Sequence, residues 1–219
     1  MEQVVPILQL IKRIEENPKE MMGNSLITQL PHFLSGYRES VSMIGKRLEW
    51  PFCKFDSWMK EKYEIKMRWS NHLALYSENE EEGLKEIFKL LKEFLKVYTH
   101  ECENHRQETE IETFNFYKLL YKIQLRPALY FGIDDIKSFR SYIEGILKAR
   151  RDFNVEKTSQ ELEYEGFPNW LIFERHNLMK KIPWDKVYYV YPYARCSLDL
   201  FFYDYNTYLQ EKYNKTLCE

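Results

Sequence analysis

The chain has 219 residues, of which 44% are hydrophobic, 16% aromatic and 30% charged. Its low glycine and proline content (7 and 8 residues) beside 5 Trp, 17 Tyr and 14 Phe excludes a disordered or collagen-like chain. The formal net charge of −2 argues against direct binding of nucleic acid through a strongly basic face.

The sequence shows little sign of a membrane or secretory segment. No apolar run approaches the ~20 residues that span a bilayer, and we expect no secretory signal, because the first six residues lack a basic stretch followed by an apolar one. The four cysteines lie far apart and form no C-x-x-C pair: Cys53, Cys102, Cys196 and Cys218. We therefore expect reduced thiols, a cytoplasmic location and no membrane partner.

The first predicted helix ends near Asn17-Pro18, because the residue before a proline is pushed out of the helical region. Its apolar stripe is predicted to contain Val5, Leu8, Ile11 and Ile14.

A loop that ends at Gly23 follows, and Asn24 or Ser25 can cap the next helix by accepting a free backbone N–H. Pro31 would remove a hydrogen bond inside a helix, so we expect that helix to start late or to kink.

Residues 83–96 have the clearest helical period in the chain. The side chains predicted to face inward are Leu84, Ile87, Phe88, Leu91, Phe94 and Leu95. Those predicted to face solvent are Lys85, Glu86, Lys89, Lys92 and Glu93.

The second half repeats landmarks of the first. Asn17-Pro18 and Gly23 match Arg126-Pro127 and Gly132, with proline and glycine five residues apart in both copies. Later landmarks also correspond: Phe55-x-x-Trp58 with Phe167-x-x-Trp170, and Trp69 with Trp184. We predict an all-α fold of two tandem homologous helical units, residues 1–100 and 114–219, packed with pseudo-two-fold symmetry and joined by a charged connector, residues 101–113. Residues 187–193 have a strand-like composition, but the repeat favours a helix there.

The sequence offers little for catalysis. His100 and His105 are five residues apart, not the four that place two metal ligands on one helix face, so a solvated connector is favoured over a metal site. No G-x-S-x-G motif is present, and Asp134-Asp135 is better explained as a helix cap. The segment from Arg126 to Gly132 resembles a loop of type II topoisomerase ATPase domains, but the glycine-rich phosphate loops are missing. We predict no enzyme activity, no metal and no cofactor.

Charge is unevenly distributed along the chain. Residues 78–112 hold eleven acidic and five basic residues, which leaves a net charge of +4 on the rest. The run at residues 78–82 precedes an apolar helix, where negative charge interacts favourably with the helix dipole. The alternative is an acidic face that attracts a basic partner. Its candidate residues are Glu78, Glu80, Glu81, Glu82, Glu108, Glu110 and Glu112.

The aromatic content of the last segment exceeds what one small helical unit can bury. The core is the default place for these side chains, and the surplus could form an interaction surface. The tyrosines concerned are Tyr188, Tyr189, Tyr191, Tyr193, Tyr203, Tyr205 and Tyr208.

The landmarks together resemble a family of small bacterial immunity proteins found beside contact-dependent growth inhibition and polymorphic toxins. The pattern is a Leu/Ile-rich helix, an R-P-x-x-Y-x-G loop, a helix with F-[IL]-x-G, then F-x-x-W, and a last helix represented here by residues 81–94. The first copy departs from it at Asn17 and Met22, and the second copy lacks the acidic run.

This resemblance implies a protein that binds the C-terminal domain of one cognate secreted toxin and blocks its active site, without catalysis. Toxin nucleases are typically basic because they bind phosphates, so charge reversal at Glu80, Glu81 and Glu82 is expected to slow association. The alternative is a non-catalytic regulatory or scaffold module that binds another protein.

Overall fold

The chain forms an all-α fold, as the sequence predicts. The computed structural model describes residues 4–5, 7–48, 50–98, 114–132, 135–189 and 194–217. Their only strands are the two-residue segments β1 (Val4–Val5) and β2 (Arg47–Leu48), which pair in parallel with Val4 opposite Arg47. None of the helices in these ranges has the length and apolar character needed to cross a membrane.

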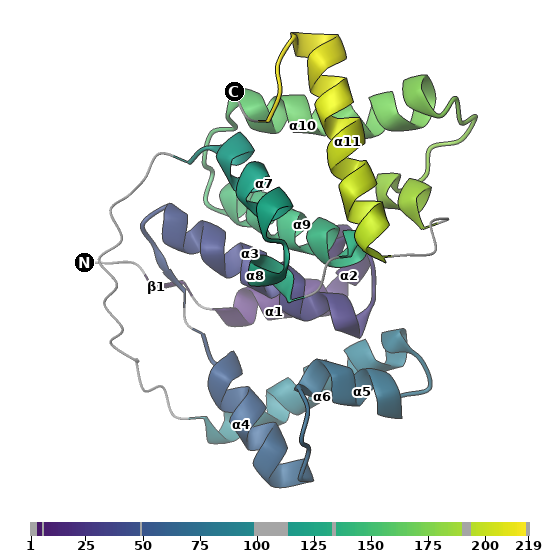
Figure 1. Cartoon of the computed structure of the whole chain (residues 1–219). Helices are drawn as coiled ribbons and strands as arrows, with labels where there is room; N and C mark the ends of the chain where they lie inside the picture. Colours follow the sequence, from purple (N-terminus) through teal and green to yellow (C-terminus); the bar gives the residue numbers. More distant parts are fainter. Residues whose placement is uncertain are drawn as a thin grey trace. The chain divides into compact units, whose positions relative to one another are not determined.

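By its internal contacts the chain divides into two compact units. Unit 1 is Met1–Glu112 with Glu144–Ala149, and unit 2 is Thr113–Ile143 with Arg150–Glu219. The helices of the first stretch, drawn from purple to blue in Figure 1, are α1 (Ile7–Glu16), α2 (Pro18–Met22), η1 (Ile27–Gln29), α3 (Leu30–Met43), α4 (Phe52–Tyr63), α5 (Trp69–Tyr76) and α6 (Glu80–Val97).

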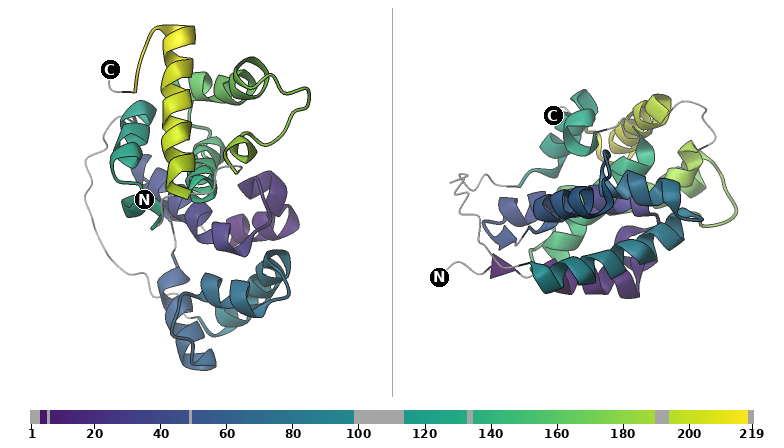
Figure 2. Two further views of the ribbon diagram at one scale, coloured as in Figure 1. Left: turned by 45° about the vertical axis from the view of Figure 1, so that its right-hand side comes forward. Right: turned by 90° about the horizontal axis from the view of Figure 1, so that it is seen from below.

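The second half of the chain follows a similar order. Its helices are α7 (Phe116–Leu125), α8 (Ala128–Phe131), α9 (Ile136–Asp152), α10 (Ser159–Asn169), the π-helical turn η2 (Trp170–Arg175), η3 (Trp184–Tyr188) and α11 (Ala194–Tyr213). Figure 2 shows α11, in yellow, as a long straight helix beside which α10 packs. Of residues 187–193, Val187 and Tyr188 are helical, and residues 190–193 lie outside the described residues.

Both halves contain a short helix between a proline and a left-handed glycine. Asn17 and Arg126, the residues before the prolines, have φ/ψ of −143°/66° and −147°/64°. Helices α2 and α8 then end at Gly23 (φ 76°) and Gly132 (φ 79°), where a Cβ atom would be strained. The matched landmarks thus adopt matching backbone conformations, whereas the pseudo-two-fold packing of the two copies stays a prediction.

The core of unit 1 differs in detail from the predicted stripes. The buried stripe of α1 is Ile7, Leu10, Ile11 and Ile14. Leu8, which the sequence predicts to face inward, is exposed on the other side of the helix. In α6 the predicted inward residues are buried except Leu95, which is half-buried. Pro31 occupies the first turn of α3, which starts late, directly after η1.

The core of unit 2 is a cluster of aromatic rings, most of which meet tilted or edge-on. Phe201 of α11 lies 4.6 Å from Phe139, 5.4 Å from Phe167 and 5.8 Å from Tyr205 between ring centroids, and all four side chains are fully buried. This core also takes in Tyr188 and Tyr208, whereas Tyr189 and Tyr203 are exposed. Tyr191 and Tyr193 lie outside the described residues.

Candidate partner-binding face

The acidic run at residues 78–82 forms the start of α6. The Asn79 side chain caps the helix by accepting the backbone N–H of Glu82 at 3.0 Å. The next three residues, Glu80 to Glu82, occupy the first turn, where their negative charge interacts favourably with the free N–H groups and the helix dipole. The helix-cap interpretation of this run therefore has a direct structural basis.

The carboxylate of Glu80 also holds a distant part of unit 1. It accepts a hydrogen bond from the Thr28 hydroxyl and a second one, at 3.3 Å, from the Thr28 backbone N–H. Because Thr28 belongs to η1, this contact joins the start of α6 to the segment that leads into α3.

Glu81 makes a second link to the same region. Its Oε1 accepts the Ser25 hydroxyl at 2.6 Å and lies 3.7 Å from the ammonium of Lys19. The Ser25 hydrogen bond and, after it, the Lys19 charge hold the pKa of Glu81 below its ordinary value.

These contacts also correct the predicted cap. Ser25 does not cap a helix but donates to Glu81, and Asn24 accepts the N–H of Leu26 at 3.1 Å, two residues on, within the loop.

The remaining candidate acids divide into three groups. Glu82 forms an ion pair at 2.5 Å with Lys85, one turn along α6. Glu78 is exposed and has no hydrogen-bond or ion-pair partner among the described residues. The connector candidates Glu108, Glu110 and Glu112 lie outside the described residues, so their position beside the α6 residues stays a prediction.

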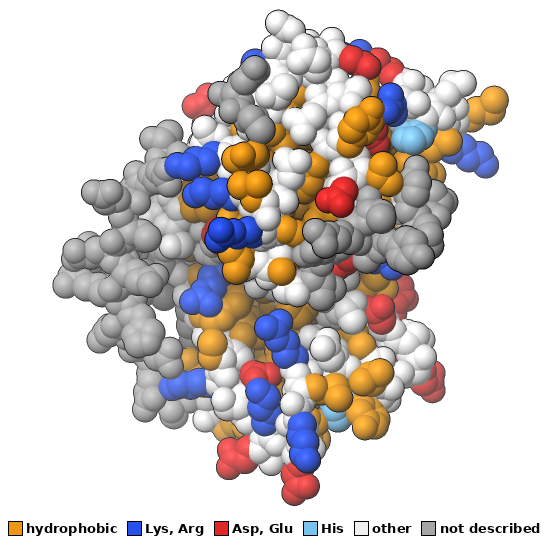
Figure 3. Space-filling view, in the orientation of Figure 1, with side chains coloured by type: hydrophobic (Ala, Val, Ile, Leu, Met, Phe, Trp, Pro, Cys, Tyr) orange, Lys and Arg blue, Asp and Glu red, His pale blue; other side chains and the backbone are white. Residues whose placement is uncertain are grey.

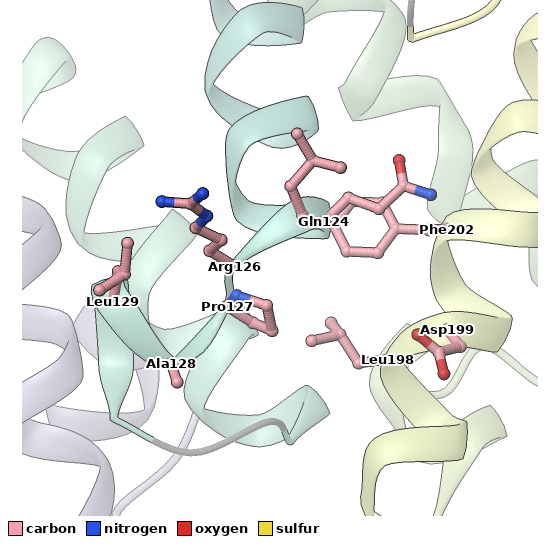
Figure 4. Close-up of a pocket in the computed structure, with 9 residues that line it drawn as sticks. Gln124, Arg126, Pro127, Ala128, Leu129, Leu198, Asp199 and Phe202 are labelled. Atoms are coloured by element: carbon pink, nitrogen blue, oxygen red, sulfur yellow. The ribbon is translucent and has the colours of Figure 1, made fainter.

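A second candidate location is a cavity of about 320 Å³ in unit 2, between the α7–α8 turn and α11. Figure 4 shows Pro127 and Leu198 facing one another from the two walls. Arg126 and Asp199 line opposite walls and form no ion pair within the described part of the chain. Leu125 and Leu129, at its edge, are 62% and 74% exposed. The cavity lining thus combines apolar side chains with one positively charged residue, Arg126, and one negatively charged residue, Asp199.

The R-P-x-x-Y-x-G segment has a structural role beside this cavity. Gly132 donates its N–H to the Ala128 carbonyl at 2.9 Å and ends α8. The ring of Tyr130 lies edge-on to that of Tyr142, with centroids 5.8 Å apart. These contacts explain the motif without a bound nucleotide.

Unit 2 buries four carboxylates that the sequence analysis did not single out. Each one has a positively charged partner from another segment: Glu161 with Arg150, Glu163 with Lys215, Asp185 with Arg140, and Asp204 with Arg175. A buried carboxylate needs such a partner because it has left water. In each pair the carboxylate and its positively charged partner are 11 to 52 residues apart in sequence, so no local sequence pattern indicates the pairing.

Tyrosine hydroxyls complete this network. Tyr117 donates to Glu163 and Tyr189 donates to Asp185. Burial, followed by these carboxylates, raises the pKa of both phenols, which keeps them neutral. Tyr117 and Tyr189 therefore stay protonated and donate to these carboxylates.

Other candidate chemistry is sparse. Within the ranges that the structure describes, His, Cys, Asp and Glu side chains do not assemble in threes or more as a metal site would require. His100, His105 and Asp134 lie outside those ranges, and Asp135 caps α9 by accepting the N–H of Ser138 at 3.0 Å.

Comparison of the chain with protein-family models, with curated proteins and with solved structures finds no match.

Proposed function

We propose that the chain is a cytoplasmic immunity protein, which binds the C-terminal domain of a cognate secreted toxin and covers its active site. The observation that carries the proposal is the recurrence, in both halves, of the pattern that resembles immunity proteins. Its prolines and glycines bound matching short helices, and Phe55 and Phe167 of the two F-x-x-W segments are fully buried. The pattern therefore consists of residues that build the fold.

Inhibition of this kind requires a surface and no catalytic group. If the toxin is a nuclease, its active site is basic because it binds phosphates, and an acidic surface on this chain would attract it. A standard interface of about 1,600 Å² then suffices to exclude substrate. Pairs of a nuclease toxin and its immunity protein reach Kd values of about 10⁻¹³–10⁻¹⁶ M.

The test is co-expression with the toxin C-terminal domain encoded immediately upstream. We expect the two chains to elute as one complex, and cells that express the toxin domain to grow only when this chain is present. A toxin domain that neither binds this chain nor is neutralised by it, or the absence of a neighbouring toxin gene, would refute the proposal. The alternative of a regulatory or scaffold module would then take its place.

A further inference from the structure

Two large apolar side chains are exposed at the end of α5. Leu75 and Tyr76 are 69% and 76% exposed, whereas Trp69 and Leu73 of the same helix are buried. Figure 3, in the orientation of Figure 1, shows hydrophobic side chains, in orange, at the surface over this part of unit 1. Since α5 already packs against α4, α6 and η1 through its other face, Leu75 and Tyr76 add nothing to the core.

The tyrosine is partly fixed before any partner binds. Its ring lies on that of His72, one turn earlier, with centroids 4.5 Å apart and planes 35° apart. A tyrosine has only two side-chain torsions, and this contact restrains them, so binding through Tyr76 loses little conformational entropy. Such prearranged, exposed aromatic side chains are typical of binding hot spots.

Negative charge lies directly beside this surface. Four glutamates follow within seven residues of Leu75, and two of them form ion pairs with Lys19 and Lys85. The start of α6 therefore keeps a net negative charge. Glu78 is two residues from Tyr76 and has no partner within the described residues, so its charge is available to a binding protein.

We propose that Leu75, Tyr76 and Glu78, here called the α5 tip, form the docking surface for a basic protein. Leu75 and Tyr76 supply the apolar anchors, and Glu78 supplies the acidic rim. This inference rests on the proposed function and names the surface that the toxin domain contacts. The cavity beside Pro127 fits a basic partner less well, because Arg126 and Asp199 contribute opposite charges there.

The test measures binding of the upstream toxin domain to purified full-length variants. Tyr76→Ala should weaken binding about 30-fold (about 2 kcal/mol at 1.4 kcal/mol per factor of ten) and Leu75→Ala about fivefold, mainly through faster dissociation. Matched controls are Tyr203→Ala and Leu129→Ala, whose side chains are 62% and 74% exposed in unit 2. Both controls should bind like the wild type.

The charge is tested separately through association rates. Glu78→Gln should slow association about threefold at low salt and have no effect at about 0.5 M salt, where exposed charges are screened. The control is Glu61→Gln, an exposed glutamate of α4, which should leave the rate unchanged.

The outcomes separate the two proposals. If the wild type binds the toxin domain and the Leu75 and Tyr76 variants bind equally well, the α5 tip is not the docking surface and the proposed function stands. Weaker binding by the Leu129 control alone would place the surface at the cavity and also overturn the inference. If the wild type does not bind, the proposed function fails and the docking surface fails with it.

Discussion

The buried ion pair between Arg150 and Glu161 gives the sharpest stability prediction. The two residues are 4% and 2% exposed. The guanidinium donates to both oxygens of the carboxylate, at 2.6 Å and 3.0 Å, and to the Glu156 carbonyl at 3.1 Å. It also lies 4.0 Å from the centroid of the Phe114 ring. Glu161 in turn accepts the backbone N–H of Thr158 at 2.8 Å and completes the capping box of α10.

Glu161→Gln keeps the shape of the side chain and removes its charge. The guanidinium of Arg150 is then buried without a counter-charge. Removing one partner of a buried ion pair generally lowers the free energy of unfolding by about 3–5 kcal/mol. We expect about 3 kcal/mol, because the glutamine carbonyl still accepts one hydrogen bond. At roughly 2–4 °C per kcal/mol for a chain of this size, Tm falls by about 6–12 °C.

Urea unfolding followed by circular dichroism measures this loss, and the exposed pair of Lys157 and Glu165 provides the control. That pair is 2.7 Å apart with side chains 43% and 45% exposed, so Glu165→Gln should change stability by less than about 1 kcal/mol. The double variant Arg150→Met/Glu161→Gln should lose about 2–3 kcal/mol less than the sum of its single variants. Equal costs for Glu161→Gln and Glu165→Gln, or additive single variants, would refute the reasoning.

Three further predictions concern packing and ionisation. Gly166→Ala should destabilise the chain by roughly 1–2 kcal/mol in urea unfolding, since the new Cβ would meet the Tyr208 hydroxyl of α11, and Tyr208→Phe should recover part of that loss. Because the pKa of Glu81 is lowered, the contribution of this carboxylate to stability is present above its ordinary pKa of 4.5 and is lost as the pH falls through the folded value. In the Ser25→Ala variant the pKa of Glu81, measured by a carbon-13 NMR titration of its carboxyl, should move back toward 4.5. Burial raises the pKa of three tyrosine hydroxyls, those of Tyr117, Tyr205 and Tyr208. Their contribution to stability is therefore present below their ordinary pKa of 10 and is lost as the pH rises through the folded value, and absorbance at 295 nm should show them ionising only on unfolding.

Local patterns in the sequence predict the local structure well. The apolar period of α6, the late start of α3 at Pro31 and the αL glycines Gly23 and Gly132 depend on residues within a few positions of one another. Leu8 shows the limit of this reasoning. The stripe through Leu8 and the stripe through Ile7 and Leu10 share Ile11 and Ile14, and only the packing of α1 in unit 1 selects between them.

The contacts of the candidate face could not be predicted, because they join distant segments. Glu80 binds Thr28 across 52 residues and Glu81 binds Ser25 across 56. An acidic run gives no sign of which distant hydroxyl it will bind. The same holds for Arg150 and Glu161, whose side chains meet only because α9 and α10 bring them together. Tyrosines are common in interaction surfaces, but Tyr205 and Tyr208 of α11 are buried in the core of unit 2.

These contacts change what a mutation in the acidic run measures. Reversing the charge of Glu80 or Glu81 would place a cation against Thr28 or beside Lys19, so the start of α6 would separate from the η1 region whether or not a toxin binds there. Slower association of such a variant could therefore report a change of fold. Glu78 has no contact of this kind within the described residues, so Glu78→Gln removes charge without removing support. If long-range attraction depends on this part of unit 1, the salt-dependent part of the association rate must fall in Glu78→Gln while the free energy of unfolding stays unchanged.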